Sequence, residues 1–442
     1  MLYDAGDGNN LLSFSNTSKV TIGKIKKDVP GGHAGQSIAY TGGSGNDRIR
    51  FSTDKFTLAG FLGIDAGAGE NRVELYGTMK LGKASAFGES LFYEGGSGND
   101  FLELSGSIVS LAGHANVSTY GGDDQFLLSS GSTFIGSSEG GVSFAFDSGL
   151  GADAFSLVAY DDPEQPDSRF GKIVATGGLL MHSGFPLFGN ADDHDLFSLE
   201  CLSLFAPSVT FSGSEGNDWF QILAERMRVG ALDYQSGGGS DTISMAGQGH
   251  LKHVEVNFGS ATASSNPGHS QINIQKSSEV PTPLVLGRHT LPGESRADFS
   301  VTFHASGENG FSVSFTHVTF NNTLVMDTGA GDNFVRLDDI RTFGGLNPDT
   351  GAGADVVEIE RYADEFLTGP SKFTKFVEIN LGNGDDTIRI GSIMGSPGAN
   401  SARFLGGLKI IGGDGTDSMN SDLTSANVII GTPVIEIEEQ DA

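Results

Sequence analysis

Short stretches in which apolar and polar residues alternate recur along the whole chain. Ile49 and Phe51 flank Arg50, and the same pattern occurs at Val73/Leu75, Leu102/Leu104, Phe155/Leu157, Phe220/Ile222, Val335/Leu337, Val357/Ile359 and Ile388/Ile390. Alternation with a period of two is typical of a strand that buries one face. Helical periodicity does not persist over any useful length, so the pattern predicts an all-β chain.

A glycine-rich turn precedes each of these strands. Its consensus is Gly-x-Gly-x-Asp, and the apolar residues lie two and four positions after the Asp. Clear copies open at Gly43, Gly96, Gly149, Gly237, Gly351, Gly382 and Gly413; degenerate copies end in Asp124 and Asp218, and others end in Asn10, Asn71 and Asn333. A turn repeated this often indicates a repeat architecture.

The spacing of the turns sets the size of one repeat. Most successive Asp or Asn positions are 22–31 residues apart. One coil of a three-sided parallel β-helix needs three short strands and three turns, about 20 to 30 residues, whereas a nonapeptide roll repeats its turn every nine. A second strand is expected before the turn, as at 377–381, and a third after it, as at 56–58. We therefore predict a single right-handed parallel β-helix over residues 1–442, with about 16 coils.

The region 259–322 is the most irregular. It lacks the acidic turn but keeps strand-like stretches at 271–274, 299–303 and 311–315. The distance of 92 residues from Asp241 to Asn333 equals four steps of 23, so we interpret the region as continuing coils with altered turns. Loops are expected to protrude at 159–171 and 392–402, where insertions commonly serve binding.

Composition supports the repeat and restricts its partners. The 66 glycines fit a chain whose turns need positive φ. The net charge of −29, from 26 basic and 55 acidic residues, makes nucleic acid a poor partner and cations good ones. The single cysteine, Cys201, excludes an intramolecular disulfide and is expected to be a small core residue.

No signal peptide or membrane-spanning run is recognisable. Because the chain begins inside a repeat, we expect it to be a piece of a longer secreted protein.

The turn has the chemistry of a calcium site. Glycines let the backbone bend so that carbonyl oxygens face a shared space, and the Asp adds a carboxylate; Ca²⁺ takes six to eight such oxygens in flexible geometry. The expected ligands are Asp47, Asp100, Asp124, Asp153, Asp218, Asp241, Asp355, Asp386 and Asp417, with Asn10, Asn71 and Asn333 at weaker sites. The alternative is that each Asp bonds only the amides that follow it, as in an Asx-turn.

The stretches 42–49 and 95–102 resemble the hemolysin-type calcium-binding repeat of repeats-in-toxin (RTX) proteins, Gly-Gly-x-Gly-x-Asp-x-apolar-x. The resemblance implies a secreted parallel β-helical or β-roll protein with Ca²⁺ between successive turns. It covers about nine residues of each coil, and the coil is longer than in that family. The pattern of one such turn per long coil also looks like that of large repeat-rich bacterial surface proteins.

A catalytic role needs paired carboxylates or a base within a groove. The candidates are the stretch 192–195, His250 with His253, and His304 with His317. We interpret the first as a degenerate calcium loop and the histidines as surface or turn residues. The sequence therefore predicts an extracellular, calcium-binding structural or adhesive element without catalytic activity. The alternatives are a carbohydrate-active β-helix, such as a polysaccharide lyase or hydrolase, and a subunit that stacks end to end into a filament. The expected partners are calcium, a second copy of the chain, and a cell-surface or polysaccharide ligand.

Overall fold

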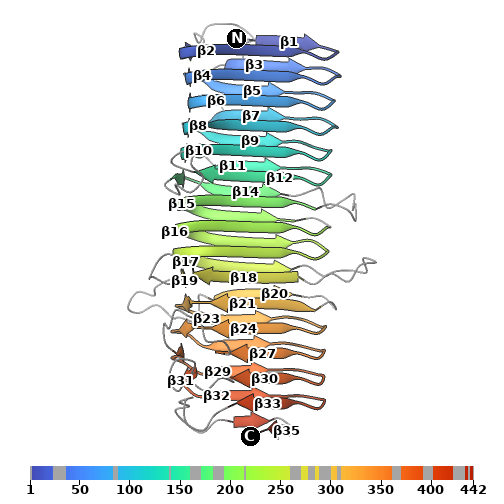
Figure 1. The fold of residues 1–442 in the computed structure, drawn as a ribbon, viewed down its shortest axis with the longest axis vertical. Helices are drawn as coiled ribbons and strands as arrows, with labels where there is room; N and C mark the ends of the chain where they lie inside the picture. The colour runs from blue at the N-terminus through green and yellow to red at the C-terminus, as the bar shows by residue number, and fades with distance from the viewer. Residues whose placement is uncertain are drawn as a thin grey trace. The chain divides into compact units, whose positions relative to one another are not determined.

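The computed structural model shows an all-β chain built from parallel strands (Figure 1). It describes residues 2–22, 36–82, 88–138, 141–159, 171–182, 194–213, 216–258, 270–276, 284–287, 300–305, 310–360, 370–391, 402–421, 434–436 and 439–441. Within these ranges there are 35 strands and no helix. The prediction of an all-β fold with parallel strands is confirmed.

The chain divides into two compact units, Met1–Val229 and Gly230–Ala442. The boundary falls inside strand β16 (Trp219–Ser236). Each unit is described by itself below.

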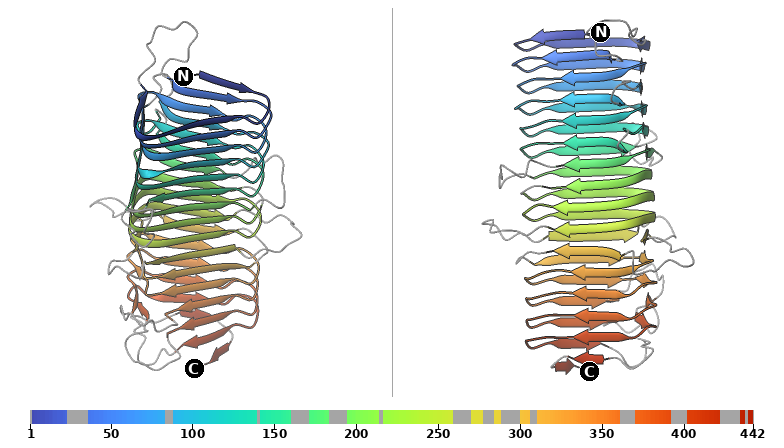
Figure 2. Two further views of the ribbon diagram at one scale, coloured as in Figure 1. Left: turned by 45° about the horizontal axis from the view of Figure 1, so that its top comes forward. Right: turned by 180° about the vertical axis from the view of Figure 1, so that it is seen from behind.

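In the first unit, most coils consist of one long strand and one short strand. Strand β4 (Arg48–Leu58) is followed by β5 (Phe61–Asp65), and β6 (Arg72–Leu81) by β7 (Glu89–Glu94). The coil before them contains β2 (Leu11–Ile22) and β3 (Gln36–Gly42), and β1 (Leu2–Gly6) belongs to the coil before that, because it pairs in parallel with β3. Later coils contain β8 (Phe101–Leu111), β9 (His114–Ser118), β10 (Gln125–Ile135), β11 (Val142–Asp147), β12 (Ala154–Ala159), β13 (Lys172–Ala175), β14 (Gly178–His182) and β15 (Leu196–Ser212). Each strand pairs in parallel with its equivalent in the next coil (Figure 2).

In the second unit, the later coils have the three short strands that the sequence predicts. These are β21 (Phe311–Thr316), β22 (Val318–Phe320) and β23 (Thr323–Asp327), then β24 (Phe334–Asp338), β25 (Arg341–Thr342) and β26 (Leu346–Asp349). They continue as β27 (Val356–Ile359), β28 (Ser371–Phe373) and β29 (Val377–Asn380), then β30 (Thr387–Ile390), β31 (Ala402–Phe404) and β32 (Leu408–Ile411). The last strands are β33 (Ser418–Ser421), β34 (Val434–Glu436) and β35 (Glu439–Asp441).

The first strand after the glycine-rich turn ends at a corner, and this corner explains why coils of the two units have different numbers of strands. In the second unit a residue with positive φ ends that strand: His317 at 57°, Asp339 at 53° and Glu360 at 56°. In the first unit β4 passes the same point with only a shift of register between Ser52 and Lys55. The chain therefore bends without leaving the sheet, and the two strands expected there are one.

The apolar positions of the alternating pattern form columns in the core. The rings of Phe126 and Phe155 stack with centroids 5.3 Å apart, and the next coil adds Phe197 at 6.0 Å from Phe155. Cys201 is buried, as predicted. Stacked aromatic rings each bury a large apolar area, so these columns are a major source of stability.

The irregular region contains three strands before β21, but one coil fewer than the spacing predicted. The strands are β18 (Ser270–Lys276), β19 (Leu284–Leu286) and β20 (Ser300–Ala305), after β17 (Thr242–Phe258). Register places Ser270 and Phe311 where other coils have the turn Asp, so Asp241 and Asn333 are three coils apart and not four. The described strands of this region pair in parallel with those before and after them, as continuing coils require. The count of four steps is wrong because more chain separates equivalent strands here than in other coils. The loops expected at 159–171 and 392–402 fall almost entirely outside the described residues.

Candidate metal centre: the Asp and Asn column at the turns

The residues predicted as calcium ligands form a buried column in each unit. Asp47, Asn71, Asp100, Asp124, Asp153, Asp218, Asp241, Asn333, Asp355, Asp386 and Asp417 all have 3% or less of their surface exposed, and Asn10 is half-buried. Asp195 is equally buried and joins the first column. The acidic side chains therefore point into the molecule and not into solvent.

An inter-coil ladder of hydrogen bonds holds this column. The amide of Asp47 donates to Oδ1 of Asn71 at 3.0 Å, and the amide of Asn71 donates to Oδ1 of Asp100 at 2.9 Å. The series continues through Asp124, Asp153, Asp195 and Asp218, at 2.6 to 3.1 Å. In the second unit the amides of Phe311, Asn333, Asp355 and Asp386 each donate to the next column residue, at 2.8 to 3.2 Å. Oδ1 thus binds an amide of the preceding coil, which differs from the local Asx-turn alternative.

A second ladder lies on the solvent-exposed side of the first. In it, each amide donates to a side chain of the preceding coil, whereas in the first ladder each amide donates to a side chain of the next coil. The amide of Asn46 donates to Oδ1 of Asn9 at 2.9 Å, and the amide of Glu70 donates to Oδ1 of Asn46 at 3.0 Å. The same contact recurs from Asp123 to Asn99 and, in the second unit, from Thr416 to Asp385. Sequence reasoning missed this ladder, although Asn or Asp often occurs one position before the motif Asp.

The second polar atom of the side chain, Nδ2 in Asn and Oδ2 in Asp, distinguishes the two residues in the inner column. Nδ2 of Asn71 donates to the carbonyl oxygens of Gly67 and Gly69 in its own turn, both at 3.1 Å. Asn10 makes the equivalent bonds to Gly6 and Gly8. An Asp has an oxygen where Asn has this amino group. Within the described residues, Oδ2 is buried without a hydrogen-bond partner in Asp47, Asp124, Asp153, Asp355, Asp386 and Asp417.

Burial raises the pKa of several column carboxyls. The pKa of Asp124 and of Asp386 rises to about 7. The pKa of Asp153 rises to about 9, through burial and the nearby charge of Asp195. Water is excluded from these sites, so the ionised form lacks the solvation that it has in the unfolded chain. Each of these carboxyls therefore favours a bound proton or a neighbouring cation at neutral pH.

A cation at this column would be held mainly by backbone oxygens. In the part of the chain that the structure describes, no three His, Cys, Asp or Glu side chains gather closely enough to hold a metal ion. Six coils instead offer a buried Oδ2 without a hydrogen-bond partner together with the carbonyl groups of the turn glycines; they are the coils of Asp47, Asp124, Asp153, Asp355, Asp386 and Asp417. Ca²⁺ accepts carbonyl and carboxylate oxygens in irregular arrangements, so this donor set suits it better than Mg²⁺.

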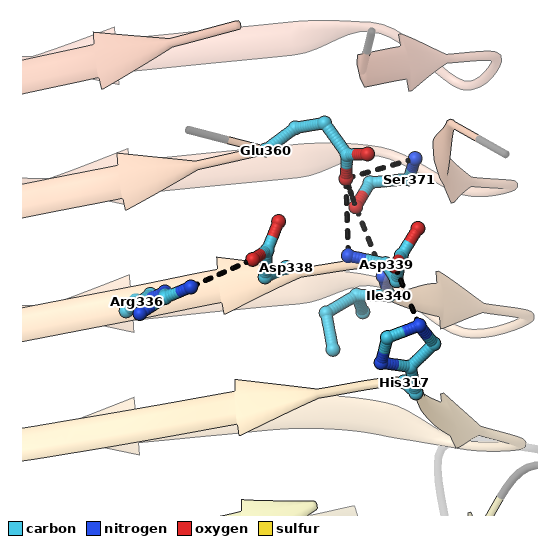
Figure 3. Close-up of polar contacts among 7 residues, drawn as sticks. All are labelled: His317, Arg336, Asp338, Asp339, Ile340, Glu360 and Ser371. Atoms are coloured by element: carbon cyan, nitrogen blue, oxygen red, sulfur yellow. Dashed lines mark hydrogen bonds and ion pairs between the residues drawn. The ribbon is translucent and has the colours of Figure 1, made fainter. Parts of the chain in front are cut away.

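A polar cluster at a corner of the second unit contains one of the candidate histidines (Figure 3). Nε2 of His317 lies 2.7 Å from Oδ2 of Asp339. Oε2 of the buried Glu360 accepts hydrogen bonds from the amides of Asp339 and Ser371, at 3.0 and 3.1 Å, and from the Ser371 hydroxyl. Burial raises the pKa of Glu360 to about 8. Sequence reasoning missed Glu360 and Ser371, because they lie 11 positions apart in the sequence and no motif marks either one.

The other candidate catalytic residues lie in separate contacts. His304 pairs with Asp327 at 3.0 Å, and the exposed His253 approaches Glu255 at 3.6 Å. Nδ1 of His194 accepts the amide of Asn217 at 3.1 Å. Asp192 and Asp193 lie outside the described residues. The structure thus gives His304 and His317 different acidic partners.

Comparison of the chain with protein-family models, with curated proteins and with solved structures gave no match. The described residues include no helix long and apolar enough to cross a membrane.

Proposed function

We propose that this chain is an extracellular calcium-binding β-solenoid, right-handed and of about 16 coils, that serves as a rigid structural or adhesive element without catalytic activity. The proposal rests on one observation. In the inner column, several coils place a buried Asp Oδ2 where the coils of Asn10 and Asn71 place the side-chain amino group.

The Asn coils indicate what the position requires. At Asn10 and Asn71 the amino group donates to two glycine carbonyls of the turn, and at Asn333 it donates to the carbonyl of Thr350 in the next coil, so the site is built around oxygen acceptors. An ionised Asp adds a further acceptor there, and buried acceptors without a donor cost about 1–3 kcal/mol each. Either a proton on Oδ2 or a cation among the oxygens removes this cost.

Calcium is the cation that suits the site and the surroundings proposed for it. A net charge of −29 attracts cations, and extracellular modules work at high calcium concentrations. Because an ion that binds only the folded state stabilises it by mass action, filling a column of such sites would stiffen every turn together. The RTX-like turn motif supports the same assignment.

Calorimetry and thermal melts in chelator test the proposal. Calcium should bind with several sites per chain, release protons at pH 7, and raise the melting temperature by many degrees, whereas magnesium at the same concentration should have little effect. Proton release is the specific readout, since it requires displacement from carboxyls such as Asp124. If the melting temperature is unchanged in excess chelator and calcium binding gives no heat, the column serves only as a hydrogen-bonded element and the proposal is wrong.

A further inference from the structure

The outward face of strands β4, β6 and β8 carries a cluster of polar and aromatic side chains. We name it the β4–β8 cluster; it contains Arg48, Arg50, Arg72, Glu74, Tyr76, Phe101 and Glu103. Register places them in adjacent columns: Arg48 is followed by Arg72 and Phe101, and Arg50 by Glu74 and Glu103. Three arginines in neighbouring positions are unusual in a chain with 26 basic and 55 acidic residues.

Glu74 is the fixed centre of the cluster. Nη2 of Arg48 lies 2.7 Å from its Oε2, and Nε of Arg72 lies 3.1 Å from its Oε1. The Glu74 side chain is only 4% exposed, while the two arginines are half-exposed. Two ion pairs therefore hold Glu74 in one geometry and leave the outer guanidinium N–H groups facing solvent.

A second carboxylate lies directly beside the first. Glu103 is opposite Glu74 in the parallel register, an arrangement that destabilises a sheet when both groups are charged. The Tyr76 hydroxyl approaches Oε1 of Glu74 at 3.1 Å and Oε2 of Glu103 at 2.8 Å. The hydroxyl has one proton and lies nearer to Glu103, and a carboxylate that accepts one such bond keeps further lone pairs on its two oxygens. The partly exposed Glu103 is thus left able to accept a further hydrogen bond.

Aromatic groups border these polar atoms. The guanidinium carbon of Arg72 lies 4.2 Å from the Phe101 ring centroid, and that of Arg50 lies 5.6 Å from the Tyr76 ring centroid. Rigid donors, a carboxylate with further acceptor capacity and ring surface therefore lie together within three adjacent coils. Vicinal hydroxyls of a sugar need donors and acceptors in this close alternation, and a sugar ring packs on aromatic surface.

We infer that the β4–β8 cluster binds a neutral polysaccharide, with Glu103 and the arginines contacting sugar hydroxyls and Tyr76 and Glu74 positioning them. An acidic polymer is disfavoured because the two carboxylates offset two of the three arginines in the cluster and the chain as a whole is strongly acidic. The inference rests on the proposed adhesive function, for which it supplies a ligand, but it does not depend on calcium at the turns.

Affinity electrophoresis of the full chain tests this inference, in native gels containing dextran, galactomannan or the acidic polymer polygalacturonate. At least one neutral polymer should retard the wild type. Tyr76→Phe and Glu103→Gln should each weaken that retardation about tenfold, the change expected for a lost hydrogen bond to a charged group. Arg228→Ala, an exposed arginine of the same unit outside the cluster, should bind like the wild type. Unchanged thermal melts would show that each variant still folds.

Several outcomes would overturn the inference. They are an absence of retardation by either neutral polymer, retardation by polygalacturonate alone, or equal binding by wild type, Tyr76→Phe and Glu103→Gln. Calcium-dependent melts recorded beside the gels separate this result from the proposed function. A chain that calcium stabilises but that binds no neutral polymer would remain a structural solenoid without this ligand. A chain that binds dextran but is not stabilised by calcium would support the polysaccharide site and contradict the calcium-binding function.

Discussion

A single atom separates Asp from Asn in the inner column, and the two residues play the same part in the ladder. Asn71 accepts an amide from the coil before it, and so does Asp124. The recurrence of Asp or Asn at this position could be predicted from the sequence as functional. Its hydrogen-bond partner could not, because the amide belongs to a residue 24 positions earlier, and only the stacking register brings the two together.

Replacement of Asp124 separates the ladder bond from the charge. Asp124→Ala leaves the buried Asp100 amide unpaired and should lower the free energy of unfolding by about 1–3 kcal/mol. Asp124→Asn keeps the acceptor and adds a donor for the turn carbonyls, so without calcium at pH 8 it should be at least as stable as the wild type. Both variants should lose calcium affinity in calorimetry. Denaturant titration gives the stabilities, with Asp54→Asn, at an exposed position of the same unit outside both ladders, as control. Equal destabilisation by Ala and Asn would argue against the ladder.

At the scale of the element, the turn works only if the coils can approach closely. Gly384 has a φ of 140°, and a Cβ there would lie 1.8 Å from the Gly353 carbonyl oxygen of the preceding coil. Gly407 also has a positive φ, 107°, but its nearest neighbour would be the Phe376 ring at 3.2 Å. That ring is half-exposed, so moving it costs less than moving a backbone carbonyl.

Alanine at these two glycines should therefore have unequal effects. Gly407→Ala should cost about 1–2 kcal/mol, the strain of a left-handed backbone. Gly384→Ala must also push two backbones apart and should cost several times more, measured by denaturant unfolding. Similar losses at both sites would mean that conformation alone, and not the packing of coils, requires the motif glycines.

The strands themselves were the most predictable elements. Period-two alternation identifies them directly, since it depends only on which face is buried. Coil boundaries were less predictable: the corner residues Asp339 and Glu360 adopt a conformation that usually favours glycine, and nothing local distinguishes them from residues within β4. The long insertions around β18 and β20 likewise hid the true number of coils between Asp241 and Asn333.

At the scale of the whole molecule, the raised pKa values reverse the usual response to pH. In the folded chain the pKa is about 7 for Asp124 and Asp386, about 8 for Glu360 and about 9 for Asp153, above the ordinary 3.8 of Asp and 4.5 of Glu, so all four bind a proton more tightly when folded. Their contribution to stability is complete below about pH 4 and is lost as the pH rises through 7 to 9. Without calcium, the melting temperature should therefore fall by about 5 to 10 °C between pH 5 and pH 9.

Calcium should abolish most of this fall, because a cation replaces the proton in the Asp column. Asp153→Asn should flatten the calcium-free profile, since an amide does not titrate. Scanning calorimetry across this pH range, with and without chelator, measures both effects. A melting temperature that instead rises from pH 5 to pH 8 would show that the column carboxylates ionise without cost.

Self-association is the last property that the surface allows us to propose. Leu2 and Leu11 are 76% and 66% exposed, on strands β1 and β2. In the described residues these strands pair only with β3 and β4, so each has an open edge, and open edges with apolar side chains template pairing with another chain. Charge repulsion between chains at −29 opposes such pairing, and calcium reduces this repulsion.

Light scattering should therefore show end-to-end growth as calcium is added, and Leu11→Lys should suppress this growth. The exposed Leu196→Lys, in a later coil of the same unit, is the matched control and should leave growth unchanged. A particle that stays monomeric at every calcium and protein concentration would contradict the filament proposal, because neither the open edge nor charge neutralisation would then be sufficient for assembly.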